Sequence, residues 1–273
     1  MANMHHINIR GVNLETAHIP GPADRAPLVF LHEGLGSIDM WNTRGRQWPV
    51  ELCKASGRAG WLYSRRGYGK SDPVEDVRGP YRERGTWSLG RHTPQYMHRE
   101  AFQVLPEWLS ALGIHRPVLV GHSDGATIAL LHASKHPVAA CVAMAPHLFV
   151  EQKALDAIKQ ARLSFESSDG VFRQRLAKFH QDPDNAFWQW NDVWLSEPFR
   201  AFDIRTECAA IESPLMCVQG LEDEYGTLEQ LDAIEQAAPH CTRLELSPCG
   251  HSPHRDQPDQ LTHALTRFLL SVP

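Results

Sequence analysis

The chain alternates between short, continuous apolar runs and longer segments in which apolar residues recur with helical spacing. Six of the runs have the length of a strand that is covered on both faces. They span residues 27–31, 60–64, 117–120, 138–145, 213–220 and 242–246. The clearest helical pattern covers 261–269. This order predicts an α/β fold, with an open and mostly parallel sheet and helices on both of its faces.

Three other segments carry weaker signals. Residues 5–9 and 12–19 alternate loosely between apolar and polar positions, which predicts an antiparallel strand pair at one edge of the sheet. The segment 40–56 is weakly periodic, and we expect one helix there. Another helix is predicted over 93–112, and Pro106 should kink it because proline has no backbone N–H.

Residues 147–205 interrupt the alternation of strands and helices. Three helical patterns follow one another without a strand between them, at 151–165, 170–180 and 184–195. The segment is therefore an insertion, and helices of this kind can cover the mouth of an active site. We predict a core domain of residues 1–146 and 206–273, with residues 147–205 as a helical cap or lid.

The same insertion is rich in aromatic residues. It holds seven of the ten Phe residues of the chain and three of the eight Trp residues. They are Phe149, Phe165, Phe172, Phe179, Phe187, Phe199, Phe202, Trp188, Trp190 and Trp194. Most of these side chains are expected to pack the insertion onto the core, and two or three to line a pocket. Trp188 is our candidate for a pocket residue.

Composition and charge narrow the range of functions. The formal net charge of -5 shows no basic excess, which argues against a nucleic-acid partner. Residues 1–8 lack the apolar region of a signal peptide, and no later run is long enough to span a bilayer, so we expect a soluble, cytoplasmic protein without a membrane partner. The six cysteines form no Cys-x-x-Cys pair, which favours buried thiols over disulfides or a metal site. No cofactor is implied.

A polar segment at 73–92 follows the second of the buried runs. It contains Arg78, Arg82, Arg84 and Arg91. These arginines could form a rim that attracts an anionic group, but the composition favours a solvated surface loop.

The strongest chemical signal is the segment 121–125, which reads Gly-His-Ser-Asp-Gly and lies between an apolar run and an apolar helical segment. This is the Gly-x-Ser-x-Gly pattern of a nucleophile elbow, in which the serine lies on a strained turn from a strand to a helix. The glycines remove side chains that would clash where strand and helix meet. The pattern predicts that Ser123 is a nucleophile at the carboxyl end of the sheet.

Two further loops carry the partners that a serine nucleophile needs. Asp223 follows the run 213–220, and His251 follows the run 242–246. Because the carboxyl ends of parallel strands share one edge of a sheet, we expect Ser123, Asp223 and His251 to meet there. In such a triad the imidazole takes the serine proton, and the carboxylate orients the imidazole and stabilises its cation.

Neighbouring residues compete for both partner roles. His254 is the alternative to His251, which we favour because it directly follows a glycine in a loop between a strand and a helix. Glu222 and Glu224 are the alternatives to Asp223, which we favour because it comes three residues after the glycine that ends its strand. One carboxylate of 222–224 is expected to orient the histidine.

The same chemistry needs donors for a developing oxyanion. We expect the backbone N–H groups of Gly34 and Asp124 to supply them. The carboxylates of Glu33 and Asp124 would oppose an oxyanion if both pointed inward, so at least one should be turned away or hydrogen-bonded. We expect Glu33 to brace loops outside the pocket. His122 is a further candidate for a pocket residue or for one that supports the pocket.

The motifs resemble those of the α/β-hydrolase family over nearly the whole chain. The matching segments are His32-Glu33-Gly34, the Arg-Gly-Tyr-Gly-Lys-Ser-Asp run at 66–72, the elbow, Gly220–Asp223 and Gly250-His251. The resemblance implies an eight-stranded sheet, a helical cap after the sixth strand, and Ser123, Asp223 and His251 as the triad. Glu33 departs from the family, whose members usually carry His-Gly there, and so does the long segment 73–92.

We expect acyl transfer to water, with Ser123 forming an acyl-enzyme from a small carboxylic ester. A serine at the elbow argues against relatives that open epoxides or remove halides through an aspartate. Hydrolysis of a C–C bond in a ring-cleavage product is one alternative, and thioester or lactone hydrolysis is another. A non-catalytic binding protein of the same fold is the alternative outside the enzymes. The partner is a small molecule in each case, and the sequence leaves the natural substrate and the oligomeric state open.

Overall fold

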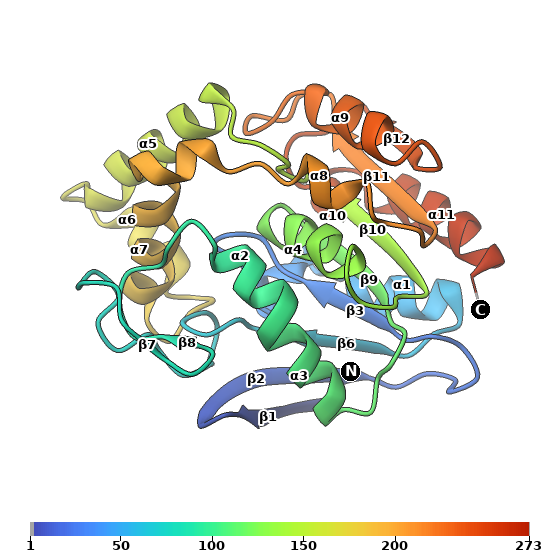
Figure 1. Ribbon diagram of the computed structural model, residues 1–273, viewed down its shortest axis with the longest axis horizontal. Coiled ribbons are helices and arrows are strands. Elements are labelled where there is room, and N and C mark those ends of the chain that lie inside the picture. Colours follow the sequence, from blue (N-terminus) through green and yellow to red (C-terminus); the bar gives the residue numbers. More distant parts are fainter. Residues whose placement is uncertain (1–2, 273) are drawn as a thin grey trace.

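The computed structural model describes residues 3–272 and is built on an eight-stranded sheet (Figure 1). The strands lie in the order β1-β2-β6-β3-β9-β10-β11-β12. In that order they span Asn3–Ile9, Val12–Ile19, Gly60–Tyr63, Leu28–Leu31, Val118–His122, Ala140–Met144, Leu215–Gly220 and Thr242–Leu246. Every neighbouring pair from β6 to β12 is parallel, whereas β2 runs antiparallel to both β1 and β6. The predicted fold class is confirmed.

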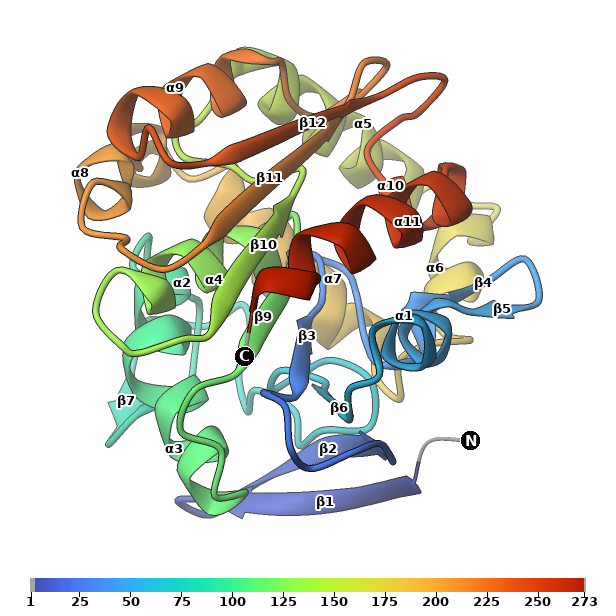
Figure 2. The same ribbon diagram turned by 90° about the vertical axis from the view of Figure 1, so that its right-hand side faces the viewer.

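Helices cover both faces of this sheet, as Figure 2 shows. One layer contains α1 (Trp48–Ser56), α10 (Pro253–Asp256) and α11 (Pro258–Phe268), and the other contains α3 (Leu105–Ala111), α4 (Asp124–Ala133) and α9 (Glu229–Ala237). Along β3, Leu28 and Phe30 belong to the apolar core under the first layer, while Val29 and Leu31 belong to the core under the second. Strands that are buried on both faces explain why these segments read as continuous apolar runs.

The helix expected over 40–56 is shorter than the sequence indicated. Residues Asp39–Trp41 form a 3-10 turn, and β4 (Asn42–Thr43) and β5 (Arg46–Gln47) form a small hairpin before α1 begins. Arg44 and Gly45, at the tip of the hairpin, have φ angles of 53° and 78°. A helix cannot continue through two residues with positive φ, so the prediction was wrong for the first half of this segment.

The helix predicted over 93–112 changes its winding in the middle. It consists of α2 (Tyr96–Arg99), a π-helical turn (Glu100–Val104) and α3. Pro106 has no N–H with which to continue the α-helical hydrogen bonds, and the N–H of Leu105 bonds to the carbonyl five residues earlier. The expected kink therefore takes the form of a wider turn.

Most of residues 73–85 are exposed, as expected of a surface loop, but residues 86–90 pack onto the molecule. The segment 73–92 contains a second small hairpin, made by β7 (Glu83–Arg84) and β8 (Trp87–Ser88). The side chain of Trp87 is buried, and its Nε1–H donates to the carbonyl of Ile9 at 3.0 Å. A large indole that is buried and hydrogen-bonded holds the segment in place, and the polar residues around it hid this contact in the sequence.

The four arginines of this segment lie in ion pairs. Arg78 and Arg91 approach Asp192 at 3.0 and 3.9 Å, Arg82 approaches Asp76 at 3.4 Å, and Arg84 approaches Glu75 at 3.8 Å. Asp192 belongs to α7 (Pro183–Trp194), so two of the pairs tie the segment to the inserted helices. The rim of free cations that we considered from the sequence is not present in this segment.

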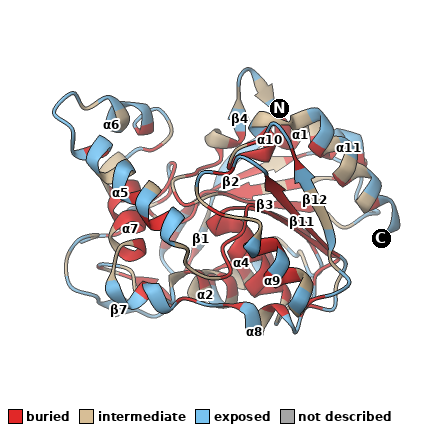
Figure 3. Ribbon diagram, turned by 90° about the horizontal axis from the view of Figure 1, so that it is seen from above, coloured by how far each residue is buried: buried red, intermediate tan, exposed pale blue. Residues whose placement is uncertain are grey.

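The inserted helices lie between β10 and β11. They are α5 (Gln152–Glu166), α6 (Val171–Leu176), α7 and α8 (Arg205–Cys208). In Figures 1 and 3, α5, α6 and α7 gather at one end of the molecule, and much of the outer surface of α5 and α6 is exposed. Between α5 and α7, the rings of Phe165 and Phe187 stack with their centroids 3.8 Å apart. Many of the aromatic residues thus hold the inserted helices together.

The structure also bears on the cysteines and on membrane-spanning segments. All six cysteines are free, and five of them are buried, while Cys241 is partly exposed. Across residues 3–272, no helix combines the length and the apolar character that crossing a membrane requires.

The backbones of β3, β9 and α4 approach one another unusually closely where the sheet meets the helix. A Cβ atom placed on Gly121 would lie 2.2 Å from the carbonyl oxygen of Gly125, and one placed on Gly125 would lie 2.0 Å from the carbonyl oxygen of Leu31. Neither distance leaves room for a side chain. The two glycines of the pentapeptide therefore allow α4 to begin directly against the central strands.

We predict that Gly125→Ala lowers the free energy of unfolding by about 3 kcal/mol, because the new methyl group forces rigid backbone segments apart. Gly113→Ala is the matched control, because Gly113 has a φ of 68° and open space around it, so only conformational strain of about 1 kcal/mol is expected. Urea denaturation of both variants measures the difference. Equal losses of stability would mean that close packing at the elbow is not what requires Gly125.

Candidate active site

Ser123 lies on the turn between β9 and α4. Its backbone has φ of 54° and ψ of -121°, a conformation that is costly for a residue with a side chain. The N–H of Ser123 donates to the carbonyl of Met144 on β10 at 2.9 Å, which holds the turn against the sheet. The strained turn directs the hydroxyl into a cavity between the sheet edge and the inserted helices.

Two loops from neighbouring strands bring Asp223 and His251 to this hydroxyl. His251 Nε2 lies 2.9 Å from Ser123 Oγ, and His251 Nδ1 lies 2.9 Å from both carboxylate oxygens of Asp223. The loops follow β11 and β12, whose carboxyl ends lie at the same sheet edge as the turn after β9. The three residues that were predicted to meet are thus within hydrogen-bond distance of one another.

Hydrogen bonding determines which nitrogen of His251 carries the proton. A carboxylate only accepts, so Nδ1–H donates to Asp223 and leaves Nε2 to accept from the hydroxyl of Ser123. Asp223 also accepts from Gln219 Nε2 at 2.6 Å and from the N–H of Tyr225 at 2.7 Å. These donors fix the carboxylate in one orientation before any ligand binds.

Charge also adjusts the acid–base properties of this pair. Burial alone lowers the pKa of His251, but its hydrogen bond to Asp223, the charge of Asp223 and the charges of Glu33 and Glu224 outweigh burial and raise the pKa above 6.5. For Asp223, burial favours the neutral acid, but the hydrogen bond and charge of His251 outweigh it and lower the pKa. Asp223 therefore stabilises the imidazolium that would form if His251 accepted a proton from Ser123.

The competing residues make other contacts. His254 is buried beside Trp41, with ring centroids 4.8 Å apart. Glu222 accepts from the N–H of Cys249 at 2.6 Å, and Glu224 accepts from the N–H of His251 at 3.1 Å. Both glutamates thus support the loop that carries His251, whereas Asp223 contacts its imidazole.

His122 and Glu33 lie on the side of His251 away from Asp223. His122 Nε2–H donates to the carbonyl of His251 at 2.7 Å and so holds its main chain in place. Burial lowers the pKa of His122, and its Nδ1 is 3.5 Å from the carboxylate of Glu33. Glu33 is part of the cavity wall, so our expectation that it braces loops outside the pocket was wrong. The adjacent polar imidazole makes this position tolerable for a carboxylate.

Asp124 follows the serine, and its carboxylate points away from the hydroxyl toward a partly buried tyrosine. The hydroxyl of Tyr96 donates to Asp124 Oδ2 at 2.5 Å, and Trp194 Nε1–H donates to the same hydroxyl oxygen at 3.0 Å. Burial raises the pKa of Asp124 by more than the charge of Arg65 and the bond from Tyr96 lower it. One of the two carboxylates is thus hydrogen-bonded, as the charge argument required.

The backbone N–H groups of Gly34 and Asp124 belong to residues that line the cavity beside Ser123. Among the residues that the structure describes, neither N–H donates a hydrogen bond within the protein. Two unpaired donors beside a serine hydroxyl can hold a negatively charged oxygen. Asp124 is the first residue of α4, whose N-terminal dipole favours negative charge at the same place.

The peptide that carries the Gly34 N–H is held by an unusual set of donors. Its carbonyl, that of Glu33, accepts from Arg65 Nη2 at 2.8 Å, from His32 Nδ1 at 2.7 Å and from the N–H of Gly36 at 3.0 Å. The buried guanidinium of Arg65 also bonds to the carbonyl of His32 at 2.5 Å. Donors on a carbonyl fix its peptide plane and strengthen the N–H on the other side.

Aromatic side chains complete the walls of the cavity, which encloses about 390 Å³ of space not filled by protein atoms, part of it open to solvent. Trp190 and Trp194 line it, whereas Trp188, our sequence candidate, packs against Phe187 and the guanidinium of Arg78. Tyr225 covers His251, with ring centroids 4.7 Å apart. Helical periodicity could not tell which indole of α7 lines the cavity, because nearly every residue of this helix is buried.

His147 is a cavity residue that the sequence analysis missed. It lies three residues after the end of β10, and its ring is 5.7 Å from that of His251. Burial lowers its pKa to about 3, so it is neutral. The same positional signal that singled out Ser123 and His251, a polar residue after a parallel strand, was available for His147. Within residues 3–272, no three His, Cys, Asp or Glu side chains come together in a way that could hold a metal ion.

The sequence also matches that of a known protein family. The profile of the alpha/beta hydrolase family matches residues 28–264, which is most of the chain. The chain belongs to this family. It is accordingly a hydrolase enzyme.

Solved structures of other hydrolases resemble this alpha/beta hydrolase at low sequence identity. The enol-lactonase from Burkholderia xenovorans LB400 has a TM-score of 0.71 and 18% identity, covering 98% of this chain and 100% of its own. A carboxylesterase structure from Nitrososphaera gargenis has a TM-score of 0.72 and 17% identity, covering 97% and 98%. A thermophilic esterase from Thermogutta terrifontis, with malate bound, has a TM-score of 0.70 and 18% identity, covering 98% of each chain. Likeness at these identities shows that the fold is shared.

We predict that Asp223→Asn lowers the pKa of His251 in this hydrolase below 6.5, because burial continues to oppose the cation after the stabilising charge is removed. An NMR titration of the imidazole signals measures the change. Glu222→Gln is the control, because Glu222 lies in the same loop as Asp223 but bonds to Ser247 and Cys249. A pKa that stays above 6.5 in Asp223→Asn would contradict the electrostatic account.

Proposed function

We propose that this hydrolase cleaves small carboxylic esters through an acyl-enzyme on Ser123, with His251 as general base and acid and Asp223 orienting it. The observation that carries the proposal is the continuous chain of hydrogen bonds, 2.9 Å from Ser123 to His251 and 2.9 Å from His251 to Asp223. A serine hydroxyl is a weak nucleophile at neutral pH unless a base takes its proton as it attacks. The tautomer inferred above leaves Nε2 free for that task.

In the first half of the proposed reaction, Ser123 Oγ attacks the ester carbonyl while its proton passes to His251 Nε2. The carbonyl oxygen becomes an oxyanion, which accepts from the N–H groups of Gly34 and Asp124. The C–O bond of the ester then breaks, and His251 returns the proton to the departing alcohol. The acyl group remains on Ser123 as an ester.

In the second half, water takes the place of the alcohol. His251 accepts a proton from the water as it attacks the acyl-enzyme, and the same two N–H groups hold the second oxyanion. The bond to Ser123 Oγ breaks, the serine recovers its proton from His251, and the carboxylic acid leaves. Each half returns His251 to the neutral state in which Nδ1–H faces Asp223.

The charge of the cavity favours an uncharged substrate. Among the described residues, its lining includes Glu33, and also Asp124, whose carboxylate is turned toward Tyr96, but no lysine or arginine. An acidic ring-cleavage product would meet the carboxylate of Glu33 and no cation, which disfavours C–C bond hydrolysis. Trp190 and Trp194 supply apolar walls for the organic part of an ester. Thioesters and lactones use the same chemistry and remain alternatives within the proposed class.

We further propose that residues 147–205 act as a cap on a core of residues 1–146 and 206–273. Ile158 of α5 and the two tryptophans of α7 line the cavity from the side of the insertion. A wall made by these helices excludes water from the serine, which strengthens the interactions with a developing charge. Movement of the same helices would control entry of the substrate.

We predict that a fluorophosphonate forms one covalent adduct on Ser123, and that Ser123→Ala lowers turnover of 4-nitrophenyl acetate by about 10³-fold or more. Intact-mass and peptide-mapping spectrometry locate the adduct, and absorbance measures turnover. Ser134→Ala is the control, because Ser134 follows the end of α4 outside the cavity and its hydroxyl donates to the carbonyl of Leu131. Failure to form an adduct, or turnover that survives in Ser123→Ala, would favour a non-catalytic binding protein.

We predict that Arg65→Met lowers kcat about tenfold with little change in KM, because loss of the guanidinium loosens the Glu33–Gly34 peptide and weakens a donor that acts in the transition state. Arg65 is a positioning residue in this account. Arg66→Met is the control, since Arg66 bonds to Pro73 and Ser88 and not to the Gly34 loop. A matching loss of kcat in both variants would point to general damage by loss of an arginine.

A further inference from the structure

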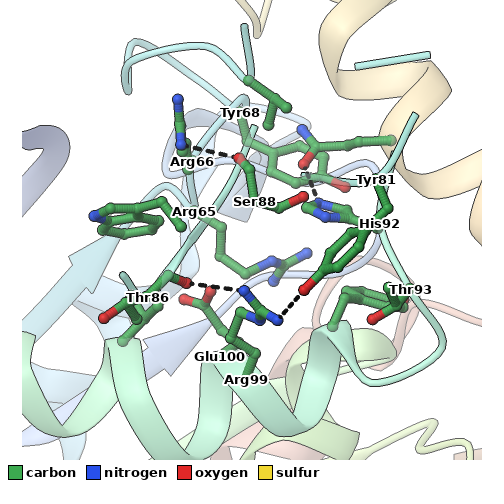
Figure 4. A pocket seen from close by; sticks show the side chains of 15 residues that line it. Arg65, Arg66, Tyr68, Tyr81, Thr86, Ser88, His92, Thr93, Arg99 and Glu100 are labelled. Carbon is green, nitrogen blue, oxygen red and sulfur yellow. Dashed lines mark hydrogen bonds between the residues drawn. The ribbon is translucent and has the colours of Figure 1, made fainter. Parts of the chain in front are cut away.

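A second cavity is lined by residues of the loops after β6 and of α2, and Figure 4 shows the side chains around it. It contains about 580 Å³ of space not filled by protein atoms, part of it open to solvent, and none of its lining residues lines the cavity at Ser123. Tyr96 belongs to its wall, and the hydrogen bond from the Tyr96 hydroxyl to Asp124 marks the partition between the two cavities. The proposed hydrolysis uses no ligand in this space.

Positive charge dominates the lining of this second cavity. Arg65, Arg66 and Arg99 line it, with Glu100 as the carboxylate. Arg99 is paired with Glu83, an exposed residue, at 2.8 Å. Within residues 3–272, Arg65 and Arg66 form no direct ion pair, although the charges of Asp124 and Glu100 act on Arg65 and those of Glu75 and Asp72 act on Arg66. Figure 4 shows the guanidinium of Arg65 directed toward the middle of the space.

Glu100 acts on Arg65 and offsets only part of the positive charge of the three arginines. Its Oε1 accepts from the hydroxyl of Tyr63 at 2.6 Å, and burial raises its pKa, which favours the neutral acid. Burial lowers the pKa of the Arg66 guanidinium by more than the charges of Glu75 and Asp72 raise it. A partly buried guanidinium without a counter-ion is costly, and a bound anion would relieve that cost.

Hydrogen-bond donors remain unused in the same place. Arg66 donates from Nε to the carbonyl of Pro73 at 3.0 Å and from Nη1 to that of Ser88 at 3.0 Å, which leaves Nη2 without a partner in the described residues. Gln189 is 1% exposed, and its side-chain Nε2 is buried without a hydrogen bond. These groups offer donors and no opposing negative charge.

The remaining walls are aromatic. Trp87 lies under the guanidinium of Arg66 at 5.7 Å, and Tyr68 lies under that of Arg65 at 5.0 Å. The ring of His92 stacks on that of Tyr96 at 5.5 Å, and burial lowers the pKa of His92 to about 4, so this ring is neutral. Flat apolar faces beside free guanidinium donors suit a flat ring that carries a negative group.

We propose that this cavity is a binding site for a small aromatic carboxylate. The carboxylate lies against Arg66 and Arg65, where the planar fork of a guanidinium matches its two oxygens. The ring lies between Trp87 and the Tyr96–His92 stack. Tyr81, which is 43% exposed, marks the mouth through which the ligand enters. The site shares no lining residue with the cavity at Ser123.

Calorimetric titration of the full chain with benzoate and with benzamide tests the proposal. The two probes share a ring and differ in charge, so we expect benzoate to bind about tenfold more tightly or better, the effect of one hydrogen bond to a charged group. Arg66→Gln is expected to remove that preference. Arg84→Gln is the matched control, because Arg84 lies in the same segment, with its side chain 76% exposed, and is expected to leave both affinities unchanged.

Thr93→Trp provides a second variant, because Thr93 lines the cavity and is partly exposed, so a larger side chain fills the space without entering the core. It should weaken both probes, and it locates the site even if Arg66→Gln does not fold. Equal affinity of wild type for benzoate and benzamide, or no binding of either, would overturn the proposal. Binding of benzoate that neither Arg66→Gln nor Thr93→Trp weakens would place the ligand elsewhere and would overturn it too.

Discussion

The close approach of three backbone segments, β3, β9 and the first turn of α4, is the constraint on which the rest of the structure depends. Gly125 has no room for a side chain against the carbonyl of Leu31, and Gly121 has none against Gly125. This contact starts the helix directly at the sheet edge and forces Ser123 into its strained turn. It also brings the N–H of Asp124 beside the loop that contains Gly34. Backbone packing thus determines where a hydroxyl and two unpaired donors can meet.

The carboxylates of Asp223 and Asp124 are hydrogen-bonded to other groups, so that an oxyanion can form at the serine with little repulsion from them. Asp223 is held by His251, Gln219 and backbone donors, and Asp124 is hydrogen-bonded by Tyr96 on the far side of the elbow. Arg65 lies behind the loop and reaches it through the carbonyls of His32 and Glu33. A guanidinium inside the cavity would stabilise the bound substrate as well as the transition state, and so would do little for the rate. Arg65 instead bonds to the peptide between Glu33 and Gly34 and orients its N–H, a neutral donor, toward the oxyanion.

Neighbouring residues on α7 connect the two cavities. Gln189 lines the second cavity, which contains Arg65 and Arg66, and Trp190 lines the cavity at Ser123. Consecutive residues on a helix point in different directions. The segment 73–92 packs against the same helix, through Arg78 and Asp192 and through a pair of hydrogen bonds between Val74 and Asn185. The inserted helices and the segment 73–92 therefore form one packed unit over the sheet edge. Its polar surface composition concealed that packing in the sequence.

The sequence alone predicted those features whose physical cause lies within one short segment of the chain. Continuous apolar runs predicted the strands, paired glycines predicted the turn at Ser123, and the order of parallel strands predicted that Asp223 and His251 would lie near it. The hairpin at Arg44 and Gly45, the burial of Trp87, the position of Glu33 and the choice of Trp190 over Trp188 were decided by the tertiary structure. So was the gathering of Arg65, Arg66 and Arg99 around one cavity, while the arginines of 73–92 found carboxylate partners. These features depend on which surfaces meet across long stretches of chain, and no short window of sequence contains both sides of such a contact.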